Sequence, residues 1–199
     1  MNLLFPTEKI IFNLPNAEME YFPTIFSAEK SKELFELLKK EVPWQHDEIV
    51  VFGKKYLQPR LTSLFGNEGK PYRYSNLVMQ PNRWNPLIMY IKNEVELFCN
   101  ENFTTVLLNY YRNGKDGNGW HADNEKELGI NPIIASVSFG AQRVFQLKHK
   151  ITNQKHNINL ENGSLLIMKG TTQHFWKHQI HKSAKEIGER INLTFRILK

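Results

Sequence analysis

Residues 190–196, RINLTFR, alternate strictly between polar and apolar side chains. Because successive side chains of a β-strand point to opposite faces, Ile191, Leu193 and Phe195 belong in a core. The other face carries two arginines, an asparagine and a threonine, and it allows two interpretations. On a half-exposed sheet this face is solvated. In the interior of a barrel, its two arginines can hold a dicarboxylate through bidentate hydrogen bonds.

Short strand-like runs fill the chain after residue 103. Turn signals separate them at Asn113-Gly114, at Gly117-Asn118-Gly119 and at Asn162-Gly163. Many short strands with regular turns predict a sandwich or a barrel. The expected strands are Thr104–Tyr111, Ile133–Phe139, Arg143–Lys148, Ser164–Met168 and Ile191–Leu198.

Two helices precede these strands. Ser27 is the expected cap of a helix that runs to Val42, with an apolar stripe on one side. Asn85 followed by Pro86 predicts a second helix that ends near Asn100. The segment from Trp44 to Pro81 shows no clear period and is expected to form hairpins or loops over one mouth of a barrel. With no linker in view, residues 1–199 are predicted to form one domain.

Composition limits the class of protein. The chain has 199 residues, is 41% hydrophobic and 23% charged, and carries a formal net charge of +6 with a pI of about 9.3. A basic surface favours a polyanion such as DNA or RNA as partner. We expect an intracellular protein without membrane contact, because no apolar run has spanning length and the N-terminus lacks signal-peptide features. A monomer is the default expectation for its oligomeric state. The single cysteine, Cys99, excludes an intrachain disulfide and a multi-cysteine metal site.

A candidate metal site lies in the stretch Trp120-His121-Ala122-Asp123. In an extended chain the side chains of His121 and Asp123 point to the same face. Joined by a distant histidine, they would form the facial triad of non-haem Fe(II) oxygenases, which leaves coordination positions open. The glycines of Gly117-Asn118-Gly119 would let the backbone enter such a site closely.

The third ligand cannot be chosen from spacing. His174, His178 and His181 all follow the strand expected at Ser164–Met168. At most one of them is needed, so the others are surface or core histidines. The remaining histidines, His46, His149 and His156, stand in polar surroundings and are predicted to lie on the surface.

Asn109 and Tyr111 share one face of the strand expected at Thr104–Tyr111. They could donate hydrogen bonds to the same dicarboxylate as the arginines. The alternative is an ordinary strand pair with Tyr111 half-buried.

Taken together, these motifs resemble the AlkB family of oxygenases in order and spacing. The resemblance covers roughly residues 55 to 198 and is closest to the mammalian-type DNA and RNA repair members. The stretch from Gly170 to His178 resembles the segment that carries the distal ligand, which selects His178 over His174 and His181. The matching segments are Asn109-x-Tyr111, His121-x-Asp123-x-Glu125, Ser138–Arg143, Gly170–His178 and Arg190-x-Asn192-x-Thr194-Phe195-Arg196, with Gln58–Thr62 and Pro71–Ser75 resembling the base-recognition region.

The resemblance implies a mainly β fold with flanking helices: a double-stranded β-helix, or jelly-roll, core over residues 104–198, and a base-recognition region with a helix over residues 55–103. It implies Fe(II) held by His121, Asp123 and His178. It also implies 2-oxoglutarate held by Arg190, which is expected at its distal carboxylate, and by Arg196, which is expected beside the iron. Asn109, Tyr111 and Asn192 complete this cofactor set.

The activity that the resemblance implies is oxidative dealkylation of bases in DNA or RNA, such as 1-methyladenine and 3-methylcytosine. Molecular oxygen and 2-oxoglutarate are consumed and formaldehyde is released. The target base must leave the helical stack to reach a buried iron. Tyr74 would stack on it, Glu125 would face its polar edge, and Arg143 would orient Glu125 or touch phosphate. Arg60, Tyr72 and Ser75 complete the expected substrate contacts. The cell compartment would be the cytoplasm in a bacterium, or the nucleus in a eukaryote.

Two other functions stay open. A related oxygenase could apply the same iron chemistry to a protein, a lipid or a small molecule, since function lives in the site and not in the fold. A nucleic-acid-binding module with an inactive metal site is the second alternative. The basic charge and the base-recognition motifs argue against the first, and the intact ligand and arginine set argues against the second.

Overall fold

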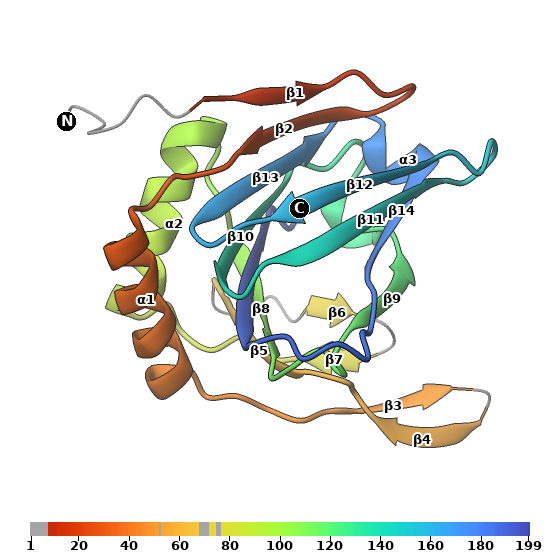
Figure 1. The fold of residues 1–199 in the computed structure, drawn as a ribbon. Helices are drawn as coiled ribbons and strands as arrows, with labels where there is room; N and C mark the ends of the chain where they lie inside the picture. Colours follow the sequence, from red (N-terminus) through yellow and green to blue (C-terminus); the bar gives the residue numbers. More distant parts are fainter. Residues whose placement is uncertain (1–7, 52, 68–71, 75–76) are drawn as a thin grey trace.

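Two antiparallel sheets face each other and form the body of the protein (Figure 1). The computed structural model describes residues 8–51, 53–67, 72–74 and 77–199, with the backbone alone described at positions 50, 51, 72–74, 77 and 78. The predicted fold class, mainly β with a jelly-roll core and flanking helices, is confirmed. Among the described helices, none is both long and apolar enough to cross a membrane.

The larger sheet has seven strands. It extends beyond the predicted core region, because strands from residues 10–22 and 61–66 join it at its two sides. In spatial order its strands are β1 (Ile10–Phe12), β2 (Glu18–Phe22), β13 (Ser164–Lys169), β10 (Ile134–Gly140), β15 (Arg190–Arg196), β8 (Thr105–Tyr111) and β5 (Leu61–Gly66).

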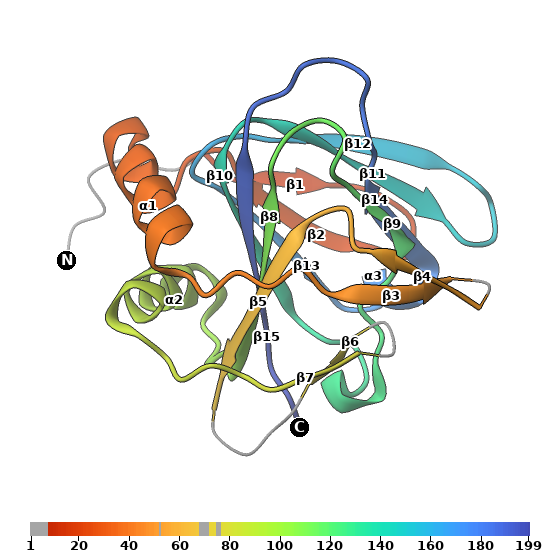
Figure 2. The ribbon, with the colours of Figure 1, turned by 90° about the horizontal axis from the view of Figure 1, so that it is seen from below.

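The smaller sheet has four strands and covers the inner face of the larger one (Figures 1 and 2). Only β11 was expected from the sequence, and the other three strands are short and rich in polar residues. In spatial order they are β12 (Lys155–Leu160), β11 (Arg143–His149), β14 (Trp176–Ile180) and β9 (Asn118–His121).

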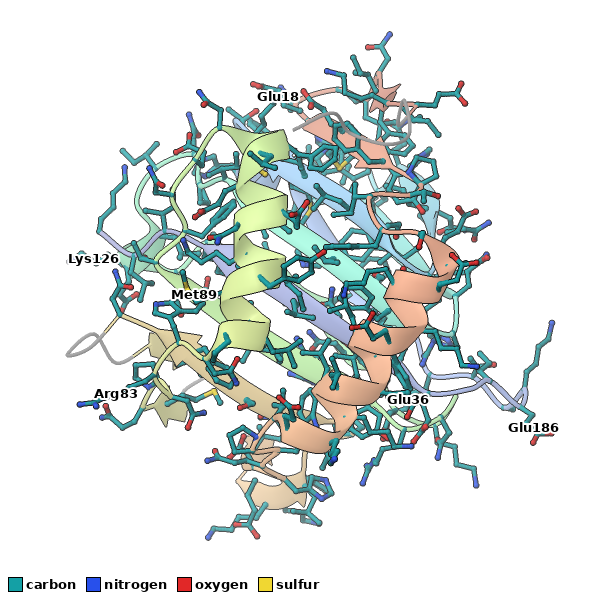
Figure 3. All side chains as sticks on the ribbon, turned by 90° about the vertical axis from the view of Figure 1, so that its left-hand side faces the viewer. Glu18, Glu36, Arg83, Met89, Lys126 and Glu186 are labelled. Carbon is teal, nitrogen blue, oxygen red and sulfur yellow. The ribbon has the colours of Figure 1, made fainter. Side chains whose placement is uncertain are left out.

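Two helices lie across the outer face of the larger sheet (Figure 3). The helix α1 (Ala28–Glu41) begins as predicted, because the side chain of Ser27 accepts a hydrogen bond from the backbone of Lys30. The helix α2 (Pro86–Cys99) begins in the same way, with Asn85 as its cap, and ends at Asn100 in a left-handed conformation.

These helices bury the apolar face of β15. Leu38 of α1 and Ile91 of α2 are fully buried in one cluster with Ile191, Leu193 and Phe195. Each such side chain contributes about 1.5–3 kcal/mol by leaving water. The face of β15 that carries its polar residues must therefore point the other way, between the two sheets.

The region between Trp44 and Pro81, expected to form hairpins or loops, contains two hairpins besides the strand β5. They are β3 (Glu48–Val51) with β4 (Lys54–Leu57), and β6 (Tyr72–Tyr74) with β7 (Leu77–Met79). The short helices η1 (Lys126–Leu128) and α3 (Thr172–Phe175) follow β9 and β13.

The prediction for two histidines was wrong. His149 is buried at the end of β11, where its ring stacks on Phe175 and its Nδ1 accepts hydrogen bonds from the backbone of Ile151 and Thr152. It shares the inward face of β11 with Phe145 and Leu147, so strand parity outweighs its polar neighbours in the sequence. His156 is half-buried, and its ring packs edge-on against Phe12. His46 is exposed, as predicted.

Candidate metal centre and cofactor pocket

The two sheets bring His121, Asp123 and His178 together. His121 is the last residue of β9, and His178 lies directly opposite it on β14. Asp123 follows two residues after His121. One ligand atom from each of the three lies within 4.8 Å of the others. The other two candidates for the third ligand lie elsewhere: His174 contacts Asn131, and His181 is exposed after β14.

The surroundings of the two histidines favour neutral imidazole rings, the form that binds a metal. The Nδ1 of His121 lies 2.7 Å from the carbonyl oxygen of Gly119, which fits an Nδ1–H donor and leaves Nε2 with its lone pair. The ring of His178 stacks on Phe145 at 4.8 Å between centroids. Burial lowers the pKa of His178 to about 3 and also lowers the pKa of His121, so both rings are unprotonated near neutral pH.

Asp123 provides the negative charge. Its side chain is 1% exposed, and its Oδ1 lies 3.1 Å from Nη2 of Arg196. Burial by itself raises the pKa of this carboxyl group, but the positive charge of Arg196 opposes it, and the resulting pKa is about 2. The carboxylate is therefore ionised near neutral pH, and two neutral imidazoles with one carboxylate are the donor set that suits Fe(II).

A glycine lets the chain before β9 pass close to β14. A Cβ atom on Gly117 would lie 2.7 Å from the carbonyl oxygen of Ile180, so no larger residue fits without a shift. At Gly119 an added Cβ meets nothing within 4 Å. Gly117 therefore brings the chain close to β14, and neither glycine is among the residues that line the cavity around the ligand cluster.

The same cavity contains the polar face of β15. Strand pairing places Arg190 opposite Tyr111 and Asn192 opposite Asn109 on neighbouring strands of the larger sheet. The cavity encloses about 450 Å³, including space open to solvent. Its polar lining is Asn109, Tyr111, Asn118, His121, Asp123, Ser136, His178, Gln179, Arg190, Asn192, Thr194 and Arg196.

Arg190 is a buried cation that lacks a carboxylate partner among the described residues. It is 1% exposed, its Nη2 donates to the hydroxyl of Ser138 at 2.9 Å, and its guanidinium lies 5.2 Å from the ring of Tyr111. Burial lowers its pKa to about 10, so it stays charged near neutral pH. Its Nε and Nη1 have no hydrogen-bond acceptor in the described part of the chain. A buried cation with open donors fits an anionic ligand.

The asparagines of this face have different surroundings. The Oδ1 of Asn109 accepts a hydrogen bond from Nε of Arg60 at 2.7 Å, and the residue lines the cavity. Asn192 uses both protons of its Nδ2, at 2.8 Å each, on the Ser136 hydroxyl and the Val137 carbonyl oxygen. Asn109 is thus free to donate to a ligand, whereas Asn192 stabilises the floor of the cavity.

The expected substrate contact of Arg143 is not supported. Its guanidinium is 3% exposed and donates to the carbonyl oxygens of Asn113, Asp116 and His181. It therefore joins the loops that follow β8 and β14, and it has no surface left for phosphate. Sequence alone could not separate this role from phosphate binding, because both use a guanidinium in a loop-rich region.

Of the other residues expected to contact substrate, the structure describes the side chains of only some. Arg60 is buried between Asn109 and the carbonyl oxygen of Gly117. Glu125 is half-buried at the start of η1. The side chains of Tyr72 and Tyr74 and the whole of Ser75 lie outside the described residues.

Known proteins that are similar in sequence to this chain include oxygenases of the kind that such a metal site suits. The family model described as the 2OG-Fe(II) oxygenase superfamily matches residues 18–196. The bovine alpha-ketoglutarate-dependent dioxygenase alkB homolog 3 is 39% identical over 184 residues, which are 87% of this chain and 64% of that protein. The chain thus spans about 64% of the length of this relative. The human DNA oxidative demethylase ALKBH2 is 35% identical over 88% of this chain and 71% of its own length.

A solved structure, entitled "The structure of OsALKBH1", has the same fold. It superposes with a TM-score of 0.61 at 16% identity, covering 93% of this chain and 99% of the other. The sequence matches, the fold and the ligand cluster agree with one another. The chain therefore belongs to the AlkB family within the 2OG-Fe(II) oxygenase superfamily.

Proposed function

We propose that this chain is an Fe(II)- and 2-oxoglutarate-dependent dioxygenase that removes alkyl groups from N-alkylated bases in DNA or RNA. One observation carries the proposal: the His121, Asp123 and His178 cluster opens into the same cavity as the buried, incompletely bonded Arg190. A metal-binding triad and a buried cation in one pocket suit a metal with an anionic co-substrate.

Iron would be held by His121, Asp123 and His178. When bound, Fe(II) and 2-oxoglutarate supply the oxidation of the alkyl carbon by molecular oxygen, with succinate, carbon dioxide and formaldehyde as products. The positive charge of Arg196 keeps Asp123 ionised as a ligand. The ring of Phe145, stacked on His178, helps to keep water from the side of the triad.

The far carboxylate of 2-oxoglutarate would bind Arg190. Its open Nε and Nη1 supply two charge-assisted hydrogen bonds, and Nδ2 of Asn109 and Tyr111 add neighbouring polar contacts. Arg196 lies at the opposite end of β15, next to Asp123. This separation supports the division in which Arg190 serves the distal carboxylate and Arg196 the metal end.

A nucleic acid is the proposed substrate. The relatives named above include a DNA oxidative demethylase, and a net charge of +6 favours binding to a polyanion. The proposed contacts with the flipped base are Tyr74 for stacking, Glu125 for its polar edge, and Tyr72, Ser75 and Arg60 around them. The hairpin β6–β7, which carries Tyr72 and Tyr74, lies on the same side of the molecule as β9 (Figures 1 and 2).

The proposal includes 1-methyladenine and 3-methylcytosine as lesions. It places the protein inside the cell, where its nucleic-acid substrate lies, and takes a monomer as the working form. It assigns base recognition to residues 55–103 and catalysis to residues 104–198, within one domain over residues 1–199.

The test is turnover of a single-stranded oligonucleotide with one 1-methyladenine. Protein loaded with Fe(II) without oxygen receives 2-oxoglutarate and air, and oligonucleotide mass and succinate are followed together. Loss of one methyl group that depends on both iron and 2-oxoglutarate is the expected result. Succinate without a change of mass would contradict the nucleic-acid substrate, and neither product from iron-loaded protein would contradict the oxygenase activity.

A further inference from the structure

Gln173 makes a buried contact with the metal-binding segment. It belongs to α3, between β13 and β14, and is 1% exposed. Its Oε1 accepts a hydrogen bond from the backbone N–H of Asp123 at 2.9 Å, across 50 residues of sequence. The contact therefore joins the helix before one ligand strand to the backbone of the carboxylate ligand.

Asp123 lies beyond the end of strand pairing. The strand β9 ends at His121, and the ladder between β14 and β9 reaches His121 opposite His178. A buried N–H without an acceptor destabilises the folded chain, so the backbone at Asp123 needs a partner. The side chain of Gln173 takes the place that a neighbouring strand would otherwise have.

Gln173 is itself held on other sides. Its backbone oxygen accepts a hydrogen bond from Nζ of Lys150 at 2.8 Å, and its Nε2 lies 3.5 Å from the sulfur of Met168. With the amide nitrogen directed at Met168, the oxygen is directed at Asp123. The amide of Gln173 is thus fixed in the orientation that accepts the Asp123 N–H.

We infer that Gln173 is a positioning residue that fixes the backbone of Asp123, so that its carboxylate meets the metal held by the two histidines. Asp123 is then held at both ends, by Gln173 at its backbone and by Arg196 at its carboxylate. The inference rests on metal binding by the triad, which is part of the proposed function, and is independent of the nucleic-acid substrate. Partners that orient a metal ligand typically contribute about 10- to 100-fold to metal affinity.

The test is titration of the metal-free protein with Co(II), whose visible absorption depends on the geometry of its ligands. Gln173→Met keeps the length of the side chain and removes the acceptor oxygen. Thr172→Val is the matched control: Thr172 is also 1% exposed in α3, but its hydroxyl bonds to the backbones of Lys169 and Glu18 and not to Asp123. Melting of the metal-free variants checks their folding.

The expected result is Co(II) binding about tenfold weaker or more in Gln173→Met, with an altered spectrum, while Thr172→Val keeps the affinity and spectrum of the unaltered protein. Equal losses in both variants would overturn the inference, because a loosened α3 would then explain them. Unchanged Co(II) binding in Gln173→Met would also overturn it. If the unaltered protein bound no Co(II), the iron assignment itself would fail.

A second measurement needs no variant. In the unaltered metal-free protein, hydrogen exchange at the Asp123 amide should be as slow as in the neighbouring strands, because Gln173 accepts that proton. Exchange as fast as in an exposed loop would refute the contact even if Gln173→Met proved unable to fold.

Discussion

Replacement of Arg190 by methionine separates binding of 2-oxoglutarate from stability. In the structure, the Nε and Nη1 atoms of Arg190 have no acceptor among the described residues, and both are buried beside Tyr111. Each hydrogen bond from a charged donor contributes roughly 1.5–3 kcal/mol, so two to one carboxylate contribute about 3–6 kcal/mol. Since about 1.4 kcal/mol is a tenfold change, Arg190→Met should weaken 2-oxoglutarate binding by roughly 10²- to 10⁴-fold.

The stability of the ligand-free protein should respond in the opposite sense. Methionine removes a buried cation together with its hydrogen bond to Ser138 and its contact with Tyr111. Replacing an uncompensated buried charge by an apolar side chain is often neutral or stabilising. The melting temperature without 2-oxoglutarate should therefore stay constant or rise, which a residue needed only for packing would not allow.

The assay is calorimetric titration of 2-oxoglutarate into Mn(II)-loaded protein without oxygen, so that no turnover occurs. Arg112→Met is the control, because the side chain of Arg112 is 39% exposed and is paired with Asp116 outside the cavity. An unchanged affinity for 2-oxoglutarate in Arg190→Met, or an equal loss in both variants, would refute the assignment of Arg190 to the distal carboxylate.

Three further outcomes are expected. His121→Ala should abolish turnover while circular dichroism shows an intact fold; retained activity would contradict the iron site. The free energy of unfolding of the metal-free protein should fall as pH falls from about 6.5, the ordinary pKa of histidine, towards 3. The folded state keeps His178 neutral over this range, whereas the unfolded state takes up the proton. The free energy of unfolding should therefore drop by up to about 1.4 kcal/mol per pH unit. Denaturant titrations that show a flat free energy of unfolding over this range would contradict that burial. Tyr74→Ala should reduce turnover of methylated oligonucleotide more than succinate formation without oligonucleotide, and equal losses would indicate packing alone.

The sequence did not predict the strands before residue 104 or the short polar strands of the smaller sheet. β14 alternates correctly, with Trp176, His178 and Ile180 buried and the residues between them half-buried. It has only five residues, and one of its three inward positions is a metal ligand, so its apolar period is too weak to distinguish it from a loop. The longer strands and both helices carried enough apolar residues and capping signals to be predicted near their observed bounds.

In the candidate site, too, some features were predictable from the sequence and others were not. The positions of His121 and Asp123 follow from a spacing of two residues, which any extended chain converts into a shared face. The contact of Gln173 with Asp123 joins segments 50 residues apart, and it exists only because β13, α3 and β14 turn back beside β9. No local sequence pattern predicts such a contact. The burial of His149, by contrast, was predictable from its parity with Phe145 and Leu147.

The ambiguity of residues 190–196 is resolved by what covers the strand on each side. Alternation alone states that the two faces differ, and a polar face is equally compatible with water and with a cavity. In the structure every residue of β15 is buried, because α1 and α2 cover its apolar face and the smaller sheet covers the other. The positive charges of two arginines enclosed in this way need negatively charged partners. Arg196 is paired with Asp123, whereas Arg190 has no carboxylate partner among the described residues. The burial that makes the strand a core element therefore also leaves the donors of Arg190 open to an anion, which is the basis of its proposed role in 2-oxoglutarate binding.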